Sequence, residues 1–452
     1  MSHTAPPTAK SQAVPGYPTF IPANPQPIAS LIKDTKHYPQ NGGKIPKVYQ
    51  ELELRGTVFK NRLFAAPMCQ YSSDNGHATD WHFVHYGSMA TRGIGAIVME
   101  ATAVVPEGRI SPEDAGIWQD SQIAPLKRIV DFVHSQGTLI GIQLAHAGRK
   151  ASTLSPWVQE QLDASADYKD VKEKSSVAHK DVGGWPDNVQ APSAIQFSPT
   201  YPVPKEMTSA KIDELKQAFT DAIERCKKAG FDFIEIHGAH RKDSYGGSLD
   251  NRLRLPLEIA QAARTQWDKP IFYRVSATDW FEGEERCDDA HDKDHEGHGE
   301  WRFWGIQQTT ILAERLKEMG IDLIDVSSGG NYAGQKIPVG PSYQVPFAAH
   351  IKQNVPGLAV RLDHTALHPQ REANPLLFHW EIQVGAVGLI TESVQANEIL
   401  ENDEADVILL ARELLRNVDF PLEVAEKLDI AVQPAVQYAR AWTRMLKPKE
   451  AH

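Results

Sequence analysis

Residues 123–149, IAPLKRIVDFVHSQGTLIGIQLAHAGR, contain one predicted helix followed by one predicted strand. The helix is apolar at four positions that share one face, Ile123, Leu126, Val130 and Val133. Gly137 is a typical helix stop, and the apolar run Leu139–Leu144 follows within two residues. A continuous apolar run of this length is typical of a strand that is buried on both faces, as in a parallel sheet.

The same alternation of helix and strand recurs along the chain. Helical patterns that end at Gly230 and Gly320 are each followed within three residues by another apolar run. Eight such runs occur: Leu63–Pro67, Ala96–Ala103, Leu139–Leu144, Phe231–His237, Ile271–Ser276, Leu323–Ser327, Val387–Ile390 and Val407–Leu410. Because no G-x-G-x-x-G follows an early strand, we predict an α/β fold that is a (β/α)8 TIM barrel, with an extended N-terminal arm and loop insertions.

The composition argues against several classes of protein. A net charge of −11 at pH 7 argues against a nucleic-acid-binding surface, and no uninterrupted apolar stretch reaches the roughly 18 residues of a membrane span. Three distant cysteines, Cys69, Cys226 and Cys287, indicate neither a disulfide framework nor an iron–sulfur cluster. The first ten residues show no secretory-signal pattern. We therefore expect a cytoplasmic protein that binds neither nucleic acid nor membrane.

The first 46 residues contain nine prolines, so this segment can form neither a helix interior nor a central strand. We expect residues 1–46 to form an extended arm and residues 47–445 to form the barrel. The arm has four candidate anchors for the barrel surface, Tyr17, Phe20, Ile21 and Leu31.

Polar and aromatic residues follow seven of the eight runs, and the C-terminal ends of barrel strands carry the chemistry of such folds. Each residue also has a structural interpretation. A single cysteine such as Cys69 is more often a small buried residue than a redox group. Gln143 is equally consistent with a polar residue inside the barrel whose hydrogen bonds are made by its neighbours. His237 and His240 suit a zinc pair, but no third ligand stands near them at ligand spacing, so we predict no metal. Arg274 on a strand needs either a buried partner or an anion.

Two further segments have open interpretations. Ser328–Gly330 and Ala411–Arg412 suit plain turns, but the loops after the last two strands of a barrel commonly bind a phosphate. The loop Cys287–His298 contains three histidines and suits a metal site, although a solvated acidic loop is the expected interpretation.

Six motifs occur in a specific order: Asn61–Leu63 with Ala66–Tyr71, then Gln143–Arg149, His237–His240, Tyr245–Arg252, Asp325–Gly330 and Ala411–Leu415. Together they resemble the Old Yellow Enzyme family of FMN-dependent ene reductases, in its thermophilic-like bacterial and fungal branch. The resemblance covers about residues 45–445. Each motif is weak alone, and their common order makes the resemblance specific.

The resemblance implies roles for individual residues. It places Ala66, Pro67, Met68 and Cys69 along the flavin ring, with Ala101 leaving room beside it. Gln143 and Arg274 would contact the pyrimidine edge of the FMN, and Gly329, Gly330, Ala411 and Arg412 would surround its phosphate. His237 and His240 would donate to the carbonyl oxygen of the substrate, and Tyr71 would close over it.

The implied activity is reduction of activated C=C bonds in α,β-unsaturated carbonyl compounds, with NADPH or NADH as the reductant. Two donors on the carbonyl oxygen make the β-carbon a hydride acceptor. The C-terminal segment Tyr438–Trp442 resembles the one through which this branch inserts an arginine into a neighbouring active site. We therefore expect a homo-oligomer in which Arg440 reaches across.

Two differences from the family concern loops. Only Arg241–Ser244 separate His240 from Tyr245, where the family has a longer segment that begins Gly-Tyr and supplies a proton donor; Lys242 stands at the tyrosine position. An insertion from Arg361 to about Val384 precedes the seventh strand, at the structural face of the barrel. A skipped coding segment and a retained intron would produce the same two differences. The alternative function is an FMN-binding barrel with impaired ene reduction, acting mainly as an NAD(P)H oxidase or inactive.

Overall fold

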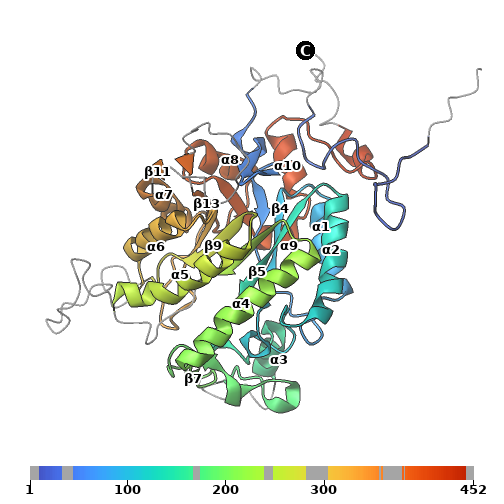
Figure 1. Cartoon of the computed structure of the whole chain (residues 1–452). Helices are drawn as coiled ribbons and strands as arrows, with labels where there is room; N and C mark the ends of the chain where they lie inside the picture. Colours follow the sequence, from blue (N-terminus) through green and yellow to red (C-terminus); the bar gives the residue numbers. More distant parts are fainter. Residues whose placement is uncertain are drawn as a thin grey trace, which may run out of the picture.

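The computed structural model describes residues 10–32, 44–165, 174–238, 248–280, 304–355, 358–359, 379–380 and 382–443. Eight parallel strands in this part of the chain close into a barrel in the order β10-β13-β14-β3-β4-β5-β8-β9 (Figure 1). They are β3 (Leu63–Ala65), β4 (Ala96–Ala103), β5 (Leu139–Ala145), β8 (Phe233–His237), β9 (Ile271–Ser276), β10 (Leu323–Ser327), β13 (Gln383–Ala386) and β14 (Val407–Leu410). The predicted (β/α)8 TIM barrel is confirmed.

Helices connect the strands on the outside of the barrel (Figure 1). They are α1 (Asp80–Ala90), α2 (Ile123–Ser135), α3 (Pro156–Ala164), α4 (Ser209–Ala229), α5 (Leu249–Gln266), α6 (Ile306–Glu318), α7 (Val345–Asn354), α8 (Ser393–Glu401), α9 (Arg412–Arg416) and α10 (Phe420–Lys427). Helix α4 ends as predicted, because Gly230 adopts a left-handed φ of 90° and its N–H donates to the Cys226 carbonyl at 3.1 Å. No helix in the described residues is long and apolar enough to cross a membrane.

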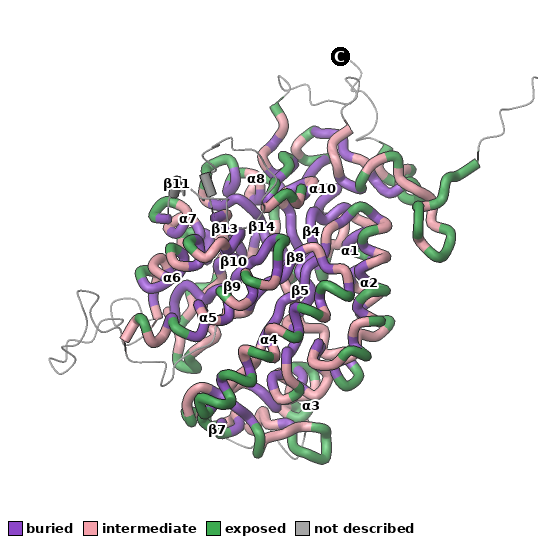
Figure 2. The backbone as a smooth tube through the Cα atoms, viewed as in Figure 1, coloured by how far each residue is buried: buried purple, intermediate pink, exposed green. Residues whose placement is uncertain are grey.

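Aromatic side chains fill the interior of the barrel. Phe233 and Phe272, on neighbouring strands, stack with ring centroids 4.4 Å apart, and Phe59 packs against both of them. Gly141 makes room for this cluster, since a Cβ at that position would come within 2.2 Å of the Phe233 ring. Figure 2 shows the buried positions concentrated along the strands and the exposed positions on the outer faces of the helices. The barrel is therefore a packed core that holds its strand ends in fixed positions.

The seventh barrel strand differs from the sequence-based expectation. The predicted run Val387–Ile390 is not a strand, and β13 occupies the four residues before it. Gly388 and Leu389 adopt φ values of 120° and 51°, which break an extended conformation. The apolar run therefore forms the loop after the strand, and the less apolar QVGA segment pairs with β10 and β14.

Short elements lie outside the barrel. β1 (Leu52–Leu54) and β2 (Thr57–Phe59) form an antiparallel hairpin, and β6 (Gln190–Ala191) pairs with β7 (Lys205–Glu206). β11 (Leu358–Ala359), which precedes the inserted segment, pairs in antiparallel orientation with β12 (His379–Trp380) inside it, and these two strands form a sheet separate from the barrel. Most of the insertion lies outside the described residues.

The N-terminal arm contacts the body of the protein near the C-terminal segment. Leu31 forms an antiparallel bridge with Val432, and the Ala29 N–H donates to the Gln433 carbonyl at 2.7 Å. The Tyr17 ring makes an edge contact with Phe132, as an anchor would. The expectation that Phe20 anchors the arm is wrong, because its side chain is 63% exposed and the segment around it turns outward.

Candidate active site

The predicted site residues within the described part of the chain lie in the C-terminal halves of barrel strands or in the loops that follow them. The residues that follow strands are Ala66, Pro67, Met68, Cys69 and Tyr71 after β3, Gly329 and Gly330 after β10, and Ala411 and Arg412 after β14. Ala101, Gln143, His237 and Arg274 lie within strands. His240 and Lys242, like the loop Cys287–His298, fall outside the described residues.

Gln143 lies at the centre of three neighbouring strands. Ala101 of β4 is its partner on one side and Glu235 of β8 on the other. The Gln143 Nε2 donates to Glu235 Oε1 at 2.7 Å, and both side chains are buried. With its amide nitrogen committed in this way, Gln143 retains its amide oxygen as an acceptor.

Arg274 lies between two buried carboxyl groups. It forms an ion pair with Asp325, its partner on β10, and the negative charge of Glu235 also acts on it. Burial would lower the pKa of Arg274, but these two charges outweigh burial and raise it. Burial raises the pKa values of Glu235 and Asp325, and Arg274 opposes both shifts. Glu235 Oε2 and Asp325 Oδ1 are buried and accept no hydrogen bond from the described residues.

The segment after β3 forms the wall of the site beside β4. Its start is fixed by a hydrogen bond from the Ala66 N–H to the Leu410 carbonyl at 2.8 Å. Cys69 is a free, half-buried cysteine, and Tyr71 adopts a left-handed φ of 47° with its ring 5.6 Å from that of Trp157. A left-handed backbone is unusual for a bulky residue, so the surroundings must hold it.

A pocket that is open to solvent lies at the C-terminal ends of β4, β5 and β8. Its lining includes Ala101, His146, Lys150, Tyr201 and His237. Burial, together with the nearby Arg149, lowers the pKa of Lys150 to about 8. The pocket therefore brings His237, the predicted donor, together with His146 and Lys150, to which the sequence analysis assigned no role.

The loops after β10 and β14 lie on the side of Arg274. Gly329 and Gly330 have φ values of 72° and 84°, which glycine adopts without strain. Burial raises the pKa of Tyr343, and the positive charges of Arg412 and Arg274 oppose this shift, so both guanidinium groups lie near the Tyr343 hydroxyl. The predicted phosphate residue and the predicted flavin-edge residue therefore lie on the same side of the site.

Sequence reasoning missed the carboxyl groups at this site. Glu235 precedes His237 by two residues and Asp325 precedes Ser327 by two, so period-two alternation along a strand places each pair on one face. This alternation is the feature of the sequence that could have indicated the two carboxyl groups. Glu100 of β4, also fully buried, carries no such signal.

Comparisons with known proteins agree with this geometry. The profile of the NADH:flavin oxidoreductase / NADH oxidase family matches residues 47–293. The chain is 40% identical to an NADH:flavin oxidoreductase of Gibberella zeae, over 97% of each chain, and 40% identical to an NADPH dehydrogenase of Geobacillus sp. (strain WCH70), over 87% of this chain and 98% of the relative. The fold is similar to that of an Old Yellow Enzyme from Pichia sp. AKU4542, with a TM-score of 0.59, 21% identity and coverage of 86% of this chain and 89% of the other.

Proposed function

The chain belongs to the NADH:flavin oxidoreductase / NADH oxidase family, and from this premise we propose that it reduces activated C=C bonds of α,β-unsaturated carbonyl compounds. It is an oxidoreductase whose cofactors are FMN and a reduced nicotinamide nucleotide. Bound FMN supplies the hydride-transfer chemistry between the nicotinamide and the substrate.

The observation that carries the proposal is the half-buried Arg274 in the C-terminal half of β9, paired with Asp325 and close to the Gln143–Glu235 pair. These residues fit the polar edge of a flavin. Arg274 supplies positive charge where a reduced flavin is negative, and Gln143 supplies an acceptor oxygen for a ring N–H. The unsatisfied oxygens of Glu235 and Asp325 fit a site that is completed by a polar ligand.

The other site residues take the roles that the resemblance implies. Met68 and Cys69, with Ala66 and Pro67 before them, line the ring of the FMN, and the small Ala101 leaves space for it. The guanidinium of Arg412, with Ala411 before it, would hold the phosphate. Gly329 and Gly330 would line this side of the site, because their N–H groups already donate to the Thr278 carbonyl and to Gln335 Oε1.

The substrate occupies the pocket that contains His237. An imidazole N–H of His237, with His240 as the second donor, holds the carbonyl oxygen of the substrate and draws electron density from its C=C bond. Tyr71, on the wall after β3, closes over the bound substrate. NADPH or NADH enters the same open pocket in a separate step.

The test is anaerobic NADPH consumption by the full-length protein with 2-cyclohexen-1-one, followed by analysis of the product. We expect cyclohexanone to form as NADPH is consumed. Replacing His237 with alanine should lower enone turnover by about 10²-fold, the usual effect of losing a donor to a developing oxyanion. His179→Ala, at an exposed position, is the matched control and should behave as wild type. A bound flavin that NADPH reduces, with no cyclohexanone formed from the enone, would contradict the proposal.

A further inference from the structure

Glu100 departs from the regular ladder of the barrel. Met99 pairs with Ile142 and Ala101 pairs with Gln143, so Glu100 is the extra residue of a β-bulge. A bulge redirects side chains, and bulges are frequent at barrel rims beside active sites. Here the bulge keeps Ala101 beside Gln143 while the Glu100 carboxylate contacts helix α1 and the segment after β3.

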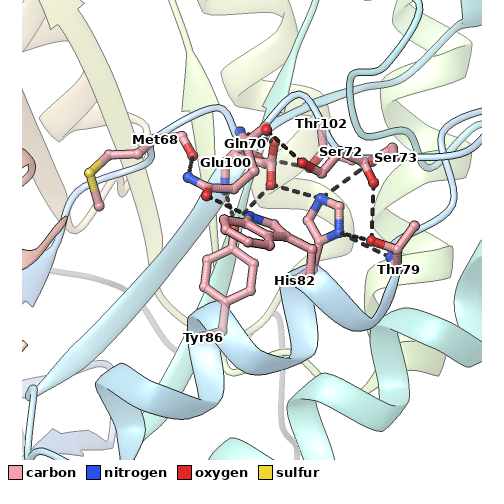
Figure 3. Close-up of polar contacts among 10 residues, drawn as sticks. Met68, Gln70, Ser72, Ser73, Thr79, His82, Tyr86, Glu100 and Thr102 are labelled. Carbon is pink, nitrogen blue, oxygen red and sulfur yellow. Dashed lines mark hydrogen bonds and ion pairs between the residues drawn. The ribbon is translucent and has the colours of Figure 1, made fainter.

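Two hydrogen-bond donors and one imidazole ring converge on the fully buried carboxylate of Glu100 (Figure 3). The Gln70 N–H donates to Oε2 at 2.8 Å, the Tyr86 hydroxyl donates to Oε1 at 3.1 Å, and His82 Nε2 lies 3.2 Å from Oε1. The Tyr86 oxygen in turn accepts the Glu100 N–H at 3.0 Å, so its proton faces the carboxylate.

The hydrogen bonds also define the state of His82. The Thr79 N–H donates to His82 Nδ1 at 3.0 Å, so this nitrogen carries no proton. His82 Nε2, the other ring nitrogen, lies 3.4 Å from the Ser73 hydroxyl oxygen and 3.2 Å from Glu100 Oε1, so it faces the carboxyl group.

Gln70 connects this carboxylate to the wall of the active site. It lies between Cys69 and Tyr71, and the left-handed φ of Tyr71 begins directly after it. Neutral contacts support the same turn: Gln70 Nε2 donates to the Met68 carbonyl at 2.8 Å, and the Ser72 hydroxyl donates to the Gln70 carbonyl at 2.8 Å. The Glu100 side chain adds a charge-assisted hydrogen bond from the Gln70 N–H, and such a bond is stronger than one between two neutral groups.

We propose that Glu100 is a positioning residue of the active site: its carboxylate fixes the turn that presents Cys69 and Tyr71 to flavin and substrate. The inference rests on the proposed function, because it assigns Glu100 a part in that same site. It has a second consequence for Cys69. Burial raises the pKa of the Cys69 thiol, and the negative charges of Asp114 and Glu100 raise it further, so Glu100 also keeps this group a thiol.

The test uses four variants of the full-length holoprotein. Glu100→Gln keeps the shape but replaces one of the two acceptor oxygens with an NH₂ group, and Glu100→Asp keeps the charge but withdraws it from Gln70. Tyr86→Phe removes one donor while retaining the carboxylate and its bond to Gln70, and therefore serves as a comparison for stability. Glu53→Gln makes the same charge change at an exposed position of β1.

The readout is the rate at which iodoacetamide alkylates Cys69 at pH 8, followed by mass spectrometry of the Cys69 peptide, beside the melting temperature of each variant. Because the thiolate is the nucleophile, Glu100→Gln should react at least about threefold faster than wild type. The alkylation rate of Glu100→Asp should lie between those of wild type and Glu100→Gln. If Glu100→Gln does not fold, the rate of Glu100→Asp alone tests the positioning role. Tyr86→Phe and Glu53→Gln should stay within about twofold of wild type, even where Tyr86→Phe lowers the melting temperature as much as Glu100→Gln.

Failure of this inference is distinct from failure of the proposed function. If wild type carries FMN and oxidises NADPH, but both Glu100 variants alkylate within about twofold of wild type, the positioning role is overturned. An equal acceleration in Tyr86→Phe would also overturn the positioning role, because a general loss of stability would then explain the faster alkylation of Cys69. If wild type carries no FMN, the proposed function fails, and the same alkylation series still decides whether Glu100 fixes Cys69.

Discussion

Asp114 is a buried carboxyl group with a shifted proton affinity, near the Cys69 wall of the site. Its Oδ2 accepts the N–H groups of Ile110 and Ser111 at 2.7 and 2.8 Å, while its buried Oδ1 has no hydrogen-bond partner among the described residues. Burial raises the pKa of Asp114 to about 7; the two backbone hydrogen bonds lower it and the charge of Glu100 raises it.

This shift predicts a pH dependence of stability. In the unfolded chain the pKa is about 3.9, so between that pH and about 7 the folded state holds the proton more tightly. The contribution of Asp114 is therefore fully present below pH 4 and is lost as the pH rises through 7. Asp114→Asn keeps an acceptor for both N–H groups and does not titrate. From pH 5 to pH 8 its unfolding free energy should rise by about 2 kcal/mol relative to wild type, measured by urea titration. Parallel profiles of the two proteins would contradict the shift.

Single residues also show what the sequence can and cannot predict about the site. Gln143 and His237 stand in short motifs and Arg274 stands on a predicted strand, so their places in the C-terminal halves of β5, β8 and β9 could be predicted, while their roles stay predictions. Glu100 could not be predicted, because its contacts depend on a bulge, and a bulge leaves no mark in the alternation of apolar and polar residues. The ion pair of Arg274 with Asp325 depends on the register between β9 and β10, which only the closed barrel fixes.

Secondary-structure elements at the opposite end of the barrel are joined through Asp322, which directly precedes β10. Its carboxylate accepts the Arg55 Nε–H at 3.1 Å, the Arg264 Nη1–H at 3.1 Å and the backbone N–H of Ile271 at 2.8 Å. Arg55 follows β1, Arg264 belongs to α5 and Ile271 begins β9. One buried carboxylate therefore connects the hairpin, a helix and two barrel strands.

Asp322→Asn should lower the unfolding free energy by about 3 kcal/mol, because it leaves two partly buried guanidinium groups without their counter-charge. Urea unfolding at pH 7 measures this change. The matched control is Asp131→Asn, which breaks an exposed pair with Lys127 on α2 and should cost less than about 0.5 kcal/mol. Equal losses in the two variants would show that Asp322 does not join these elements.

Most barrel strands could be predicted because strands buried on both faces are continuous apolar runs, as in Leu139–Leu144. The predicted seventh strand is misplaced by four residues, because β13 (QVGA) has one large apolar residue, whereas the adjacent loop Val387–Ile390 (VGLI) has three. The left-handed φ of Leu389 excludes that loop from the sheet, and nothing in its composition indicates this conformation.

In the whole molecule, the N-terminal arm around Leu31 and the C-terminal segment around Val432 lie side by side. The arm around Leu31 pairs with Val432, and the segment that follows Val432 leads to Arg440, which is exposed. Trp442 beside it packs against the core, so this segment is held on the body of the protein. An exposed Arg440 is free to contact a second copy of the chain, and the homo-oligomer expected from the sequence stays a prediction.

The central claim is that this barrel is an FMN-dependent oxidoreductase. Its most direct test is anaerobic mixing of the purified full-length protein with NADPH, and in parallel with NADH, while the visible flavin absorbance is recorded. We predict that the protein carries FMN, that at least one nicotinamide bleaches the oxidised flavin band, and that adding 2-cyclohexen-1-one restores it. A protein without flavin, or a flavin whose oxidised spectrum persists with both nucleotides, would contradict the account.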